Sequence, residues 1–390
     1  MRHKAGGNRA GKRQTATGIL ITLPIADCRI TNPKKMNATN IYNEALGLLK
    51  ELISIPSFSR EEDQTAGAIA RFLGERGIEH SRIANNVFAF NKFSDASRPT
   101  ILLNSHHDTV KPNQGYTHDP FSPIEKHGKL FGLGSNDAGG PLVSLMAAFL
   151  HFYNEPSLQY NIALAATAEE EISGHNGIEK LLPSLGNIFF AIVGEPTKMQ
   201  MAIAEKGLLV LDCTATGKAG HAARNEGENA IYKAMKDIDW FRSFQFPKVS
   251  ELLGPVKMSV TVIHTDNKAH NVVPPQCAFV ADIRVNELYT FDELLAEIKK
   301  NVTAEVKPRS MRMRSSLIPV SHPVVQSGIK LGRTYYGSPT TSDKALMPFP
   351  ALKMGPGDSA RSHTADEFIY TEEIKEGIDI YINLLKNILY

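Results

Sequence analysis

The sequence predicts an α/β fold built on a mixed sheet and interrupted by an inserted ferredoxin-like α+β domain. In the first half of the chain and again near its end, short apolar strands alternate with helices, as in a sheet covered on both sides. Between these parts, the expected strands alternate apolar and polar residues. A chain of 390 residues is also long enough to divide its core between two domains.

The elements of the first domain follow from the spacing of apolar residues. Leucine and isoleucine recur every three or four residues from Ile41 until Pro56 stops the helix, and a second helix ends at Gly77. A long apolar helix is expected over 141–153. The expected strands are continuous apolar runs, typical of strands buried on both faces, at 87–90, 100–104, 161–167 and 188–193.

The pattern changes near Lys206. From there the expected elements follow the order strand, helix, strand, strand, helix, strand, which is the split ferredoxin-like unit. Their ranges are, in this order, 207–216, 225–244, 257–264, 276–285, 291–301 and 306–314. We therefore expect an inserted domain over 207–314 and a discontinuous first domain over 36–206 and 315–390.

Residues 1–35 stand apart in composition. They contain eight basic residues and one acid, Asp27, whereas the whole chain carries +2, so the remainder carries a net charge of −5. We expect a disordered extension, with the working protein starting near Met36. An export signal or an organellar transit peptide is the alternative, because the short apolar run 18–26 follows the basic residues.

The composition of the remaining chain argues against several classes of protein. A mildly acidic body has no basic stripe of the kind that nucleic acid requires. Three cysteines, none of them in a CxxC pair, favour neither a disulfide framework nor a thiolate metal site, and they suit a reducing, cytoplasmic location. No apolar run reaches the ~18 residues of a membrane span. We therefore expect neither nucleic acid nor a membrane as a partner.

Residues with catalytic chemistry gather at the ends of expected strands, where the active sites of open α/β sheets lie. His106 and Asp108 are two residues apart and share one face of an extended backbone, so the carboxylate could orient a metal-bound imidazole. Asp137 lies in a glycine-rich loop before a helix. Taken singly, the first pair could be a polar strand end and Asp137 could be a helix N-cap.

A run of three carboxylates, Glu169-Glu170-Glu171, directly follows another buried strand. Such a run would be unremarkable in a solvated helix. Close to the sheet, however, the carboxylates repel one another unless a cation holds them together. Neighbouring glutamates could then divide the work, with one as a metal ligand and the other as a general base.

Glu195 ends a further buried strand ahead of Pro196, and His363 lies in a glycine-rich loop before the last helix. Alone, each is more often part of a turn than a ligand. Together the clusters offer nitrogen and oxygen ligands that suit Zn²⁺, with Co²⁺ or Mn²⁺ as alternatives. A shared carboxylate could bridge two such ions ~3.5–4 Å apart, as in two-metal hydrolases.

The order of these motifs resembles the M20 metallopeptidase family. HxD, GxxDxxG, TxEEExxG, GEPT and HxADE follow one another along the chain. The resemblance implies two divalent metal ions per subunit. His106, Asp137 and Glu195 would hold one ion, while Asp137, Glu171 and His363 would hold the other, so that Asp137 would bridge the two.

The resemblance further implies that Glu170 is the general base and that Asp108 orients His106. The chain departs from the family pattern at two positions. It has Glu169 where aspartate is frequent, and Gly139 where lysine is frequent. Neither residue is a ligand in the family, so these departures leave the implied roles unchanged.

In the family the inserted domain serves as a lid and as a dimerisation domain. The motif Gly-Lys-Ala-Gly-His, ending at His221, resembles the lid motif whose histidine reaches the active site of the neighbouring subunit and binds the carbonyl oxygen. Asn271 and Arg284 match residues that contact the substrate carboxylate or order the lid. A surface-loop histidine and an ion pair between Arg284 and Asp282 are the alternatives.

The loop 355–363 resembles the acetylornithine deacetylase branch of the family, which acts on acylated ornithine or citrulline in arginine biosynthesis. In that loop Arg361 could hold a substrate carboxylate bidentately. We therefore expect a homodimeric amidohydrolase for a small N-acetyl or N-succinyl amino acid. The alternatives are succinyl-diaminopimelate desuccinylase, a di- or tripeptidase or carboxypeptidase, and an inactive binding protein on the same fold.

Overall fold

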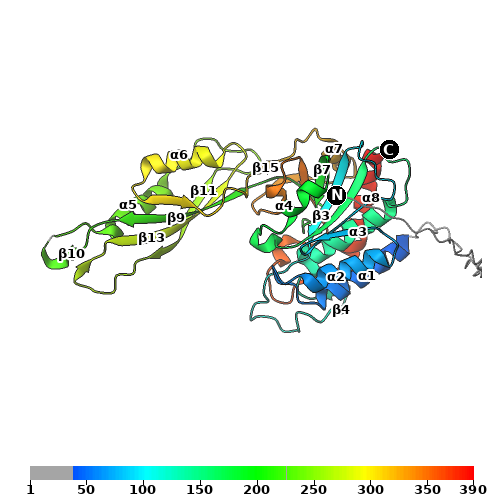
Figure 1. Ribbon diagram of the computed structural model, residues 1–390, viewed down its shortest axis with the longest axis horizontal. Coiled ribbons are helices and arrows are strands. Elements are labelled where there is room, and N and C mark those ends of the chain that lie inside the picture. Colours follow the sequence, from blue (N-terminus) through cyan, green and yellow to red (C-terminus); the bar gives the residue numbers. More distant parts are fainter. Residues whose placement is uncertain (1–37, 225) are drawn as a thin grey trace, which may run out of the picture. The chain divides into compact units, whose positions relative to one another are not determined.

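The computed structural model describes residues 38–224 and 226–390 (Figure 1), so the expected extension over 1–35 lies outside the described residues. The largest sheet has nine strands, in the order β1-β2-β6-β3-β7-β17-β8-β15, with β16 paired to β8. At its centre, β3 (Thr100–His106) pairs in parallel with both β6 (Asn161–Thr167) and β7 (Ile188–Val193). Every residue of β3 and β6 is buried, as the continuous apolar runs predicted.

The outer strands make the sheet mixed, because β2 and β15 run antiparallel to their neighbours while β16 and β17 add parallel pairs. A separate sheet of three short strands, β18-β5-β4, contacts the turn Ser135–Gly139 through β18. The bounds are β1 (Ser81–Ile83), β2 (Asn86–Phe90), β4 (Ile124–Lys126), β5 (Lys129–Phe131), β8 (Met201–Glu205), β15 (Ser316–Leu317), β16 (Tyr335–Ser338), β17 (Ala351–Lys353) and β18 (Phe368–Tyr370).

Helices cover both faces of the nine-stranded sheet. The almost wholly buried helix α3 (Gly140–Phe152) packs on β3 and contacts α1 (Ala38–Ile53) and α8 (Thr371–Leu389). The short helix α4 (Ile178–Leu181) packs on the opposite face. Its first and last residues, Ile178 and Leu181, belong to a buried apolar cluster with residues of the central strands. Two further helices are α2 (Asp63–Gly74) and α7 (Pro323–Lys330). The predicted mixed-sheet α/β fold is therefore confirmed.

A second, four-stranded antiparallel sheet has the order β11-β13-β9-β14. Along the chain, its elements follow the predicted order of strand, helix, strand, strand, helix, strand. They are β9 (Gly207–Thr216), α5 (Ala230–Ser243), β11 (Lys257–His264), β13 (Gln276–Val285), α6 (Phe291–Asn301) and β14 (Glu305–Pro308). All of them lie within 207–314, and those bounds for an inserted domain remain a prediction.

Two elements of this second unit differ from the expected ranges. Helix α5 begins at Ala230, later than expected, because the side chain of Asn229 caps it by accepting a hydrogen bond from the N–H of Ile231. The last strand begins at Glu305 and ends at Pro308, not at 314, and one further bond, from the N–H of Arg309 to the backbone oxygen of Val210, continues its pairing with β9. In the described part of the chain, no helix is both long and apolar enough to cross a membrane.

Candidate metal centre

His106 is the last residue of β3, at the carboxyl end of the parallel strands. Its Nδ1 lies 2.9 Å from the backbone oxygen of Asp108 and 3.4 Å from the Oδ1 of the same residue. Acceptors on that side favour the tautomer in which Nδ1 carries the hydrogen and Nε2 presents a lone pair. Within the described residues, Nε2 is one of few buried polar atoms without a hydrogen-bond partner.

The carboxylates around this nitrogen come from three other segments. The Nε2 of His106 lies 3.4 Å from Asp137, 3.8 Å from Glu195 and 3.9 Å from Glu170. A buried imidazole nitrogen that faces three carboxylates, and makes no hydrogen bond, is the arrangement expected of a metal ligand.

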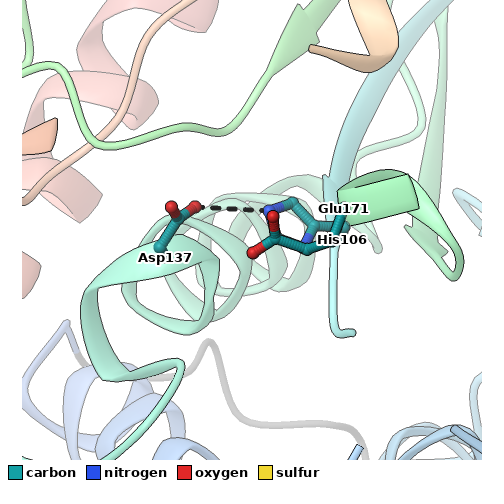
Figure 2. A group of neighbouring side chains, drawn as sticks. All are labelled: His106, Asp137 and Glu171. Atoms are coloured by element: carbon teal, nitrogen blue, oxygen red, sulfur yellow. Dashed lines mark ion pairs between the residues drawn. The ribbon is translucent and has the colours of Figure 1, made fainter. Parts of the chain in front are cut away.

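Asp137 lies in a single irregular turn, Ser135–Gly139, between β5 and α3. Gly139, rather than Asp137, occupies the N-cap position of α3, so Asp137 does not cap this helix. Its carboxylate and that of Glu171 converge on the ring of His106 (Figure 2). On the other side, the Nε2 of His363 lies 3.0 Å from Glu171 and 3.6 Å from Asp137.

The run of three glutamates turns sharply where β6 ends. Glu169 has a φ of 56° and is turned away from the centre, because its two oxygens accept hydrogen bonds from the backbone and the side chain of Asn176. Glu170 and Glu171 follow on a short 3₁₀ turn and face the centre. Their backbone N–H groups donate to the carboxylate of Asp108, at 3.0 and 3.2 Å.

The electrostatics of the cluster show an excess of negative charge. Burial raises the pKa of Glu170 well above its ordinary value, and the nearby Glu195 raises it further. Burial raises the pKa of Glu195 itself to about 8. Although burial alone would lower the pKa of His106, the surrounding carboxylates prevail and raise it. Divalent cations would remove this conflict by compensating the carboxylates directly.

The donor set therefore fits metal ions. Two groups of ligand atoms lie within 4.8 Å of one another, namely His106 with Asp137 and Glu171, and His106 with Glu170 and Glu195. These groups bring together four of the five predicted ligands, with His363 beside them, and they also include Glu170, which the sequence predicted to be the general base and not a ligand. They combine these ligands differently from the predicted sets, in which Asp137 is the shared residue, so the division between two ions stays a prediction.

Four other predicted site residues are not part of this cluster. His221 lies in the short strand β10 (Gly220–His221), is exposed, and accepts a hydrogen bond from the N–H of Ala223 at Nδ1. Strand β10 pairs with β12 (Val272–Val273), and this pairing places the predicted substrate-binding residue Asn271 beside His221. The backbone oxygen of Asn271 accepts a hydrogen bond from the N–H of Ala222.

The two predicted substrate-binding arginines both have carboxylate partners within the chain. Arg284 donates to both oxygens of Asp282, at 2.8 and 3.0 Å. This is the ion pair that the sequence analysis gave as the alternative to a role in substrate binding. Arg361 donates to both oxygens of Glu373, at 2.7 and 3.0 Å. A role of either arginine toward the substrate remains a prediction.

The structure adds buried charged residues that the sequence analysis did not single out. Lys353, at the end of β17, pairs with Glu205 at 3.2 Å, and its charge lowers the pKa of Glu195. Asp343 accepts a hydrogen bond from Thr167. Lys353 stands in the otherwise apolar run 350–354, and this pattern could have indicated a buried lysine from the sequence.

Comparisons with known proteins show what the whole chain is similar to. The model of the Peptidase family M20/M25/M40 matches residues 102–387. Succinyl-diaminopimelate desuccinylase of Methylobacterium sp. (strain 4-46) is 30% identical over 282 residues, covering 66% of this chain and 70% of that protein. The desuccinylase of Pelagibacter ubique (strain HTCC1062) is 26% identical over 384 residues, covering 89% and 99%.

Solved structures share the fold at lower identity. An M20 family metallo-carboxypeptidase from Sulfolobus solfataricus has a TM-score of 0.70 at 18% identity, covering 88% of this chain and 98% of its own. Aminopeptidase PepT from Bacillus cereus has a TM-score of 0.72 at 18% identity, covering 90% and 99%.

Proposed function

The chain belongs to the M20/M25/M40 peptidase family of metal-dependent hydrolases, and we propose that it hydrolyses the amide bond of an N-succinyl amino acid. The observation that carries the chemistry is the buried Nε2 of His106, which has no hydrogen-bond partner within the described residues and faces three carboxylates. The succinyl group is proposed because several curated relatives are named succinyl-diaminopimelate desuccinylases. Arginine biosynthesis, expected from the sequence, receives no support from these comparisons.

The residues present would hold two divalent ions, Zn²⁺ before Co²⁺ or Mn²⁺, in the manner that the motifs imply. When bound, such ions make a water nucleophilic near neutral pH and polarise the amide carbonyl. Ligands from separate segments would keep both ions at the carboxyl end of the sheet. They are His106, Asp137, Glu171, Glu195 and His363.

Glu170 is the proposed general base. It lies among the ligands, while the oxygens of its neighbour Glu169 are occupied by Asn176. The carboxylate of Glu170 takes a proton from the attacking water as the new C–O bond forms at the carbonyl carbon. It then returns this proton to the nitrogen as the C–N bond breaks, which leaves a carboxylic acid, carrying the second proton of the water, and a free amine.

Other side chains support these steps. Asp108 fixes the turn that carries Glu170 through two backbone N–H bonds, and its backbone oxygen orients His106. We further propose that His221, from the lid of a second subunit, donates a hydrogen bond to the oxyanion that forms at the carbonyl.

A substrate panel tests the proposal. N-acetyl and N-succinyl forms of diaminopimelate, ornithine, citrulline and lysine, together with dipeptides, are assayed with Zn²⁺ or Co²⁺. We expect the highest kcat/KM on an N-succinyl substrate. The loop with Arg361, which resembles the ornithine and citrulline branch, is the reason to include those amino acids. A preference for acetyl substrates would overturn the choice of acyl group, and a preference for dipeptides would favour a peptidase.

A further inference from the structure

Glu367 is a carboxylate buried to 2% exposure close to the metal centre, yet it is not among the predicted ligands. Its Oε1 accepts hydrogen bonds from the backbone N–H groups of Asn136 and Asp137, at 2.8 and 2.9 Å. Its Oε2 accepts a third bond from the N–H of Gly134, at 3.2 Å. One side chain therefore satisfies three backbone donors of the loop that carries Asp137.

The pairing of two short strands explains how residues more than two hundred positions apart meet. Glu367 directly precedes β18, and the loop of Asp137 directly follows β5, with Phe368 opposite Phe131 in the antiparallel ladder. The backbone N–H of Gly132 continues this ladder by donating to the backbone oxygen of Glu367. The side chain of Glu367 thus emerges beside the loop.

The loop depends on an external acceptor because its own backbone is irregular. Asp137 has φ −119° and ψ 98°, outside the helical region, and Gly134 has a positive φ of 75°. A second link joins the same segments, since the side chain of Asn136 exchanges hydrogen bonds with the backbone of Asp358, at 2.9 and 3.1 Å. The segment 355–367, which carries His363, is therefore bonded to the loop of Asp137 at two places.

We propose that Glu367 is a positioning residue for the metal centre: it holds Asp137 in place and ties it to the segment that carries His363. The inference rests on the proposed metal site. Glutamate suits this role because both of its side-chain oxygens accept, so that they receive three converging N–H groups. Glutamine keeps the shape but offers one acceptor oxygen and turns a donor toward the loop.

Metal titration of the metal-free protein tests this role without relying on activity. Zn²⁺ affinity and stoichiometry are measured for the wild type, Glu367→Gln, Glu367→Ala and the matched control Asp366→Asn. Asp366 is the adjacent residue, and its carboxylate accepts backbone bonds from Thr117 and His118, on a loop without predicted ligands. Thermal unfolding of each metal-free variant is recorded in parallel.

We expect Glu367→Gln to weaken metal binding, and Glu367→Ala to weaken it more, within the ~10–100-fold range typical of residues that support metal ligands. Asp366→Asn should bind as the wild type does. A folded Glu367→Gln variant that binds Zn²⁺ as tightly as the wild type, with only a lower Tm, would overturn the inference. If Glu367→Ala does not fold, the result for Glu367→Gln alone decides the test. A wild type that binds no ion would overturn the metal centre itself.

Discussion

The side chain of Glu170 is proposed to take a proton from the attacking water and to return it to the leaving nitrogen. General acid–base catalysis of this kind contributes ~10²–10⁴-fold to the rate. Glu170→Ala should therefore lose at least that factor in kcat at full metal occupancy, and Glu170→Asp should lose less, because a shortened carboxylate still reaches the water. Steady-state kinetics with measured metal content checks this.

Glu169→Ala is the matched control one residue away. Because both oxygens of Glu169 are bonded to Asn176, its loss should lower the stability of the loop and leave kcat nearly unchanged. If instead Glu169→Ala stopped turnover while Glu170→Ala did not, the assignment of base and ligand along this run would be off by one residue.

Asp137 is proposed to serve both ions and His363 only one. Asp137→Asn should therefore reduce the occupancy of both ions, whereas His363→Ala should mainly empty one. Metal analysis of the purified variants by mass spectrometry provides the count. Two tightly bound ions in Asp137→Asn would contradict a bridging role.

For single residues, the sequence predicted which side chains the structure brings together, but not their surroundings. His106 and Glu170 could be predicted because motif order and strand ends are local signals. The hydrogen bonds of Glu367 to the loop of Asp137 could not be predicted, since they depend on the pairing of β18 with β5. The ion pair of Arg361 with Glu373 likewise joins a loop to the start of α8.

Among the elements, α5 depends on a defined N-terminal cap. The side chain of Asn229 accepts the N–H of Ile231, so Asn229→Ala should lower the free energy of unfolding by about 1 kcal/mol. Chemical denaturation followed by circular dichroism measures this. Lys236→Ala, an exposed change on the same helix, is the control and should stay within about 0.5 kcal/mol of the wild type. Equal effects of the two changes would argue against the cap.

Most elements of six or more residues were predicted well, and most shorter ones were not. The ranges of β9, β13 and α6 agree with the expected ones, because ten or more residues carry a clear period. The two-residue strands β10 and β12 form only through their mutual pairing, which leaves no periodic pattern in the sequence. The cap at Asn229 is a local signal that could have set the start of α5.

For the whole molecule, a dimer through the second unit remains a proposal. Tyr232 and Met235 lie on one face of α5 and are 71% and 56% exposed. On β11, an edge strand of the four-stranded sheet, Val262 and Ile263 are more than half exposed. Apolar side chains on an edge strand and on a helix are typical of surfaces that another subunit covers.

The same proposal places His221 in the active site of the partner. Mixing inactive His221→Ala with inactive Glu170→Ala should then restore part of the activity, because heterodimers contain one intact site. Subunit exchange is verified separately with differently tagged subunits. If exchange is complete and no activity returns, His221 does not act between subunits.

The dependence of turnover on two ions is the most direct test of the account. Metal-free protein is titrated with Zn²⁺ while bound metal and hydrolysis of an N-succinyl substrate are followed in the same samples. We predict no turnover without metal and the full rate only when two ions are bound per subunit, with the secondary structure unchanged throughout. Metal-free protein that hydrolyses the substrate at the full rate would contradict the account.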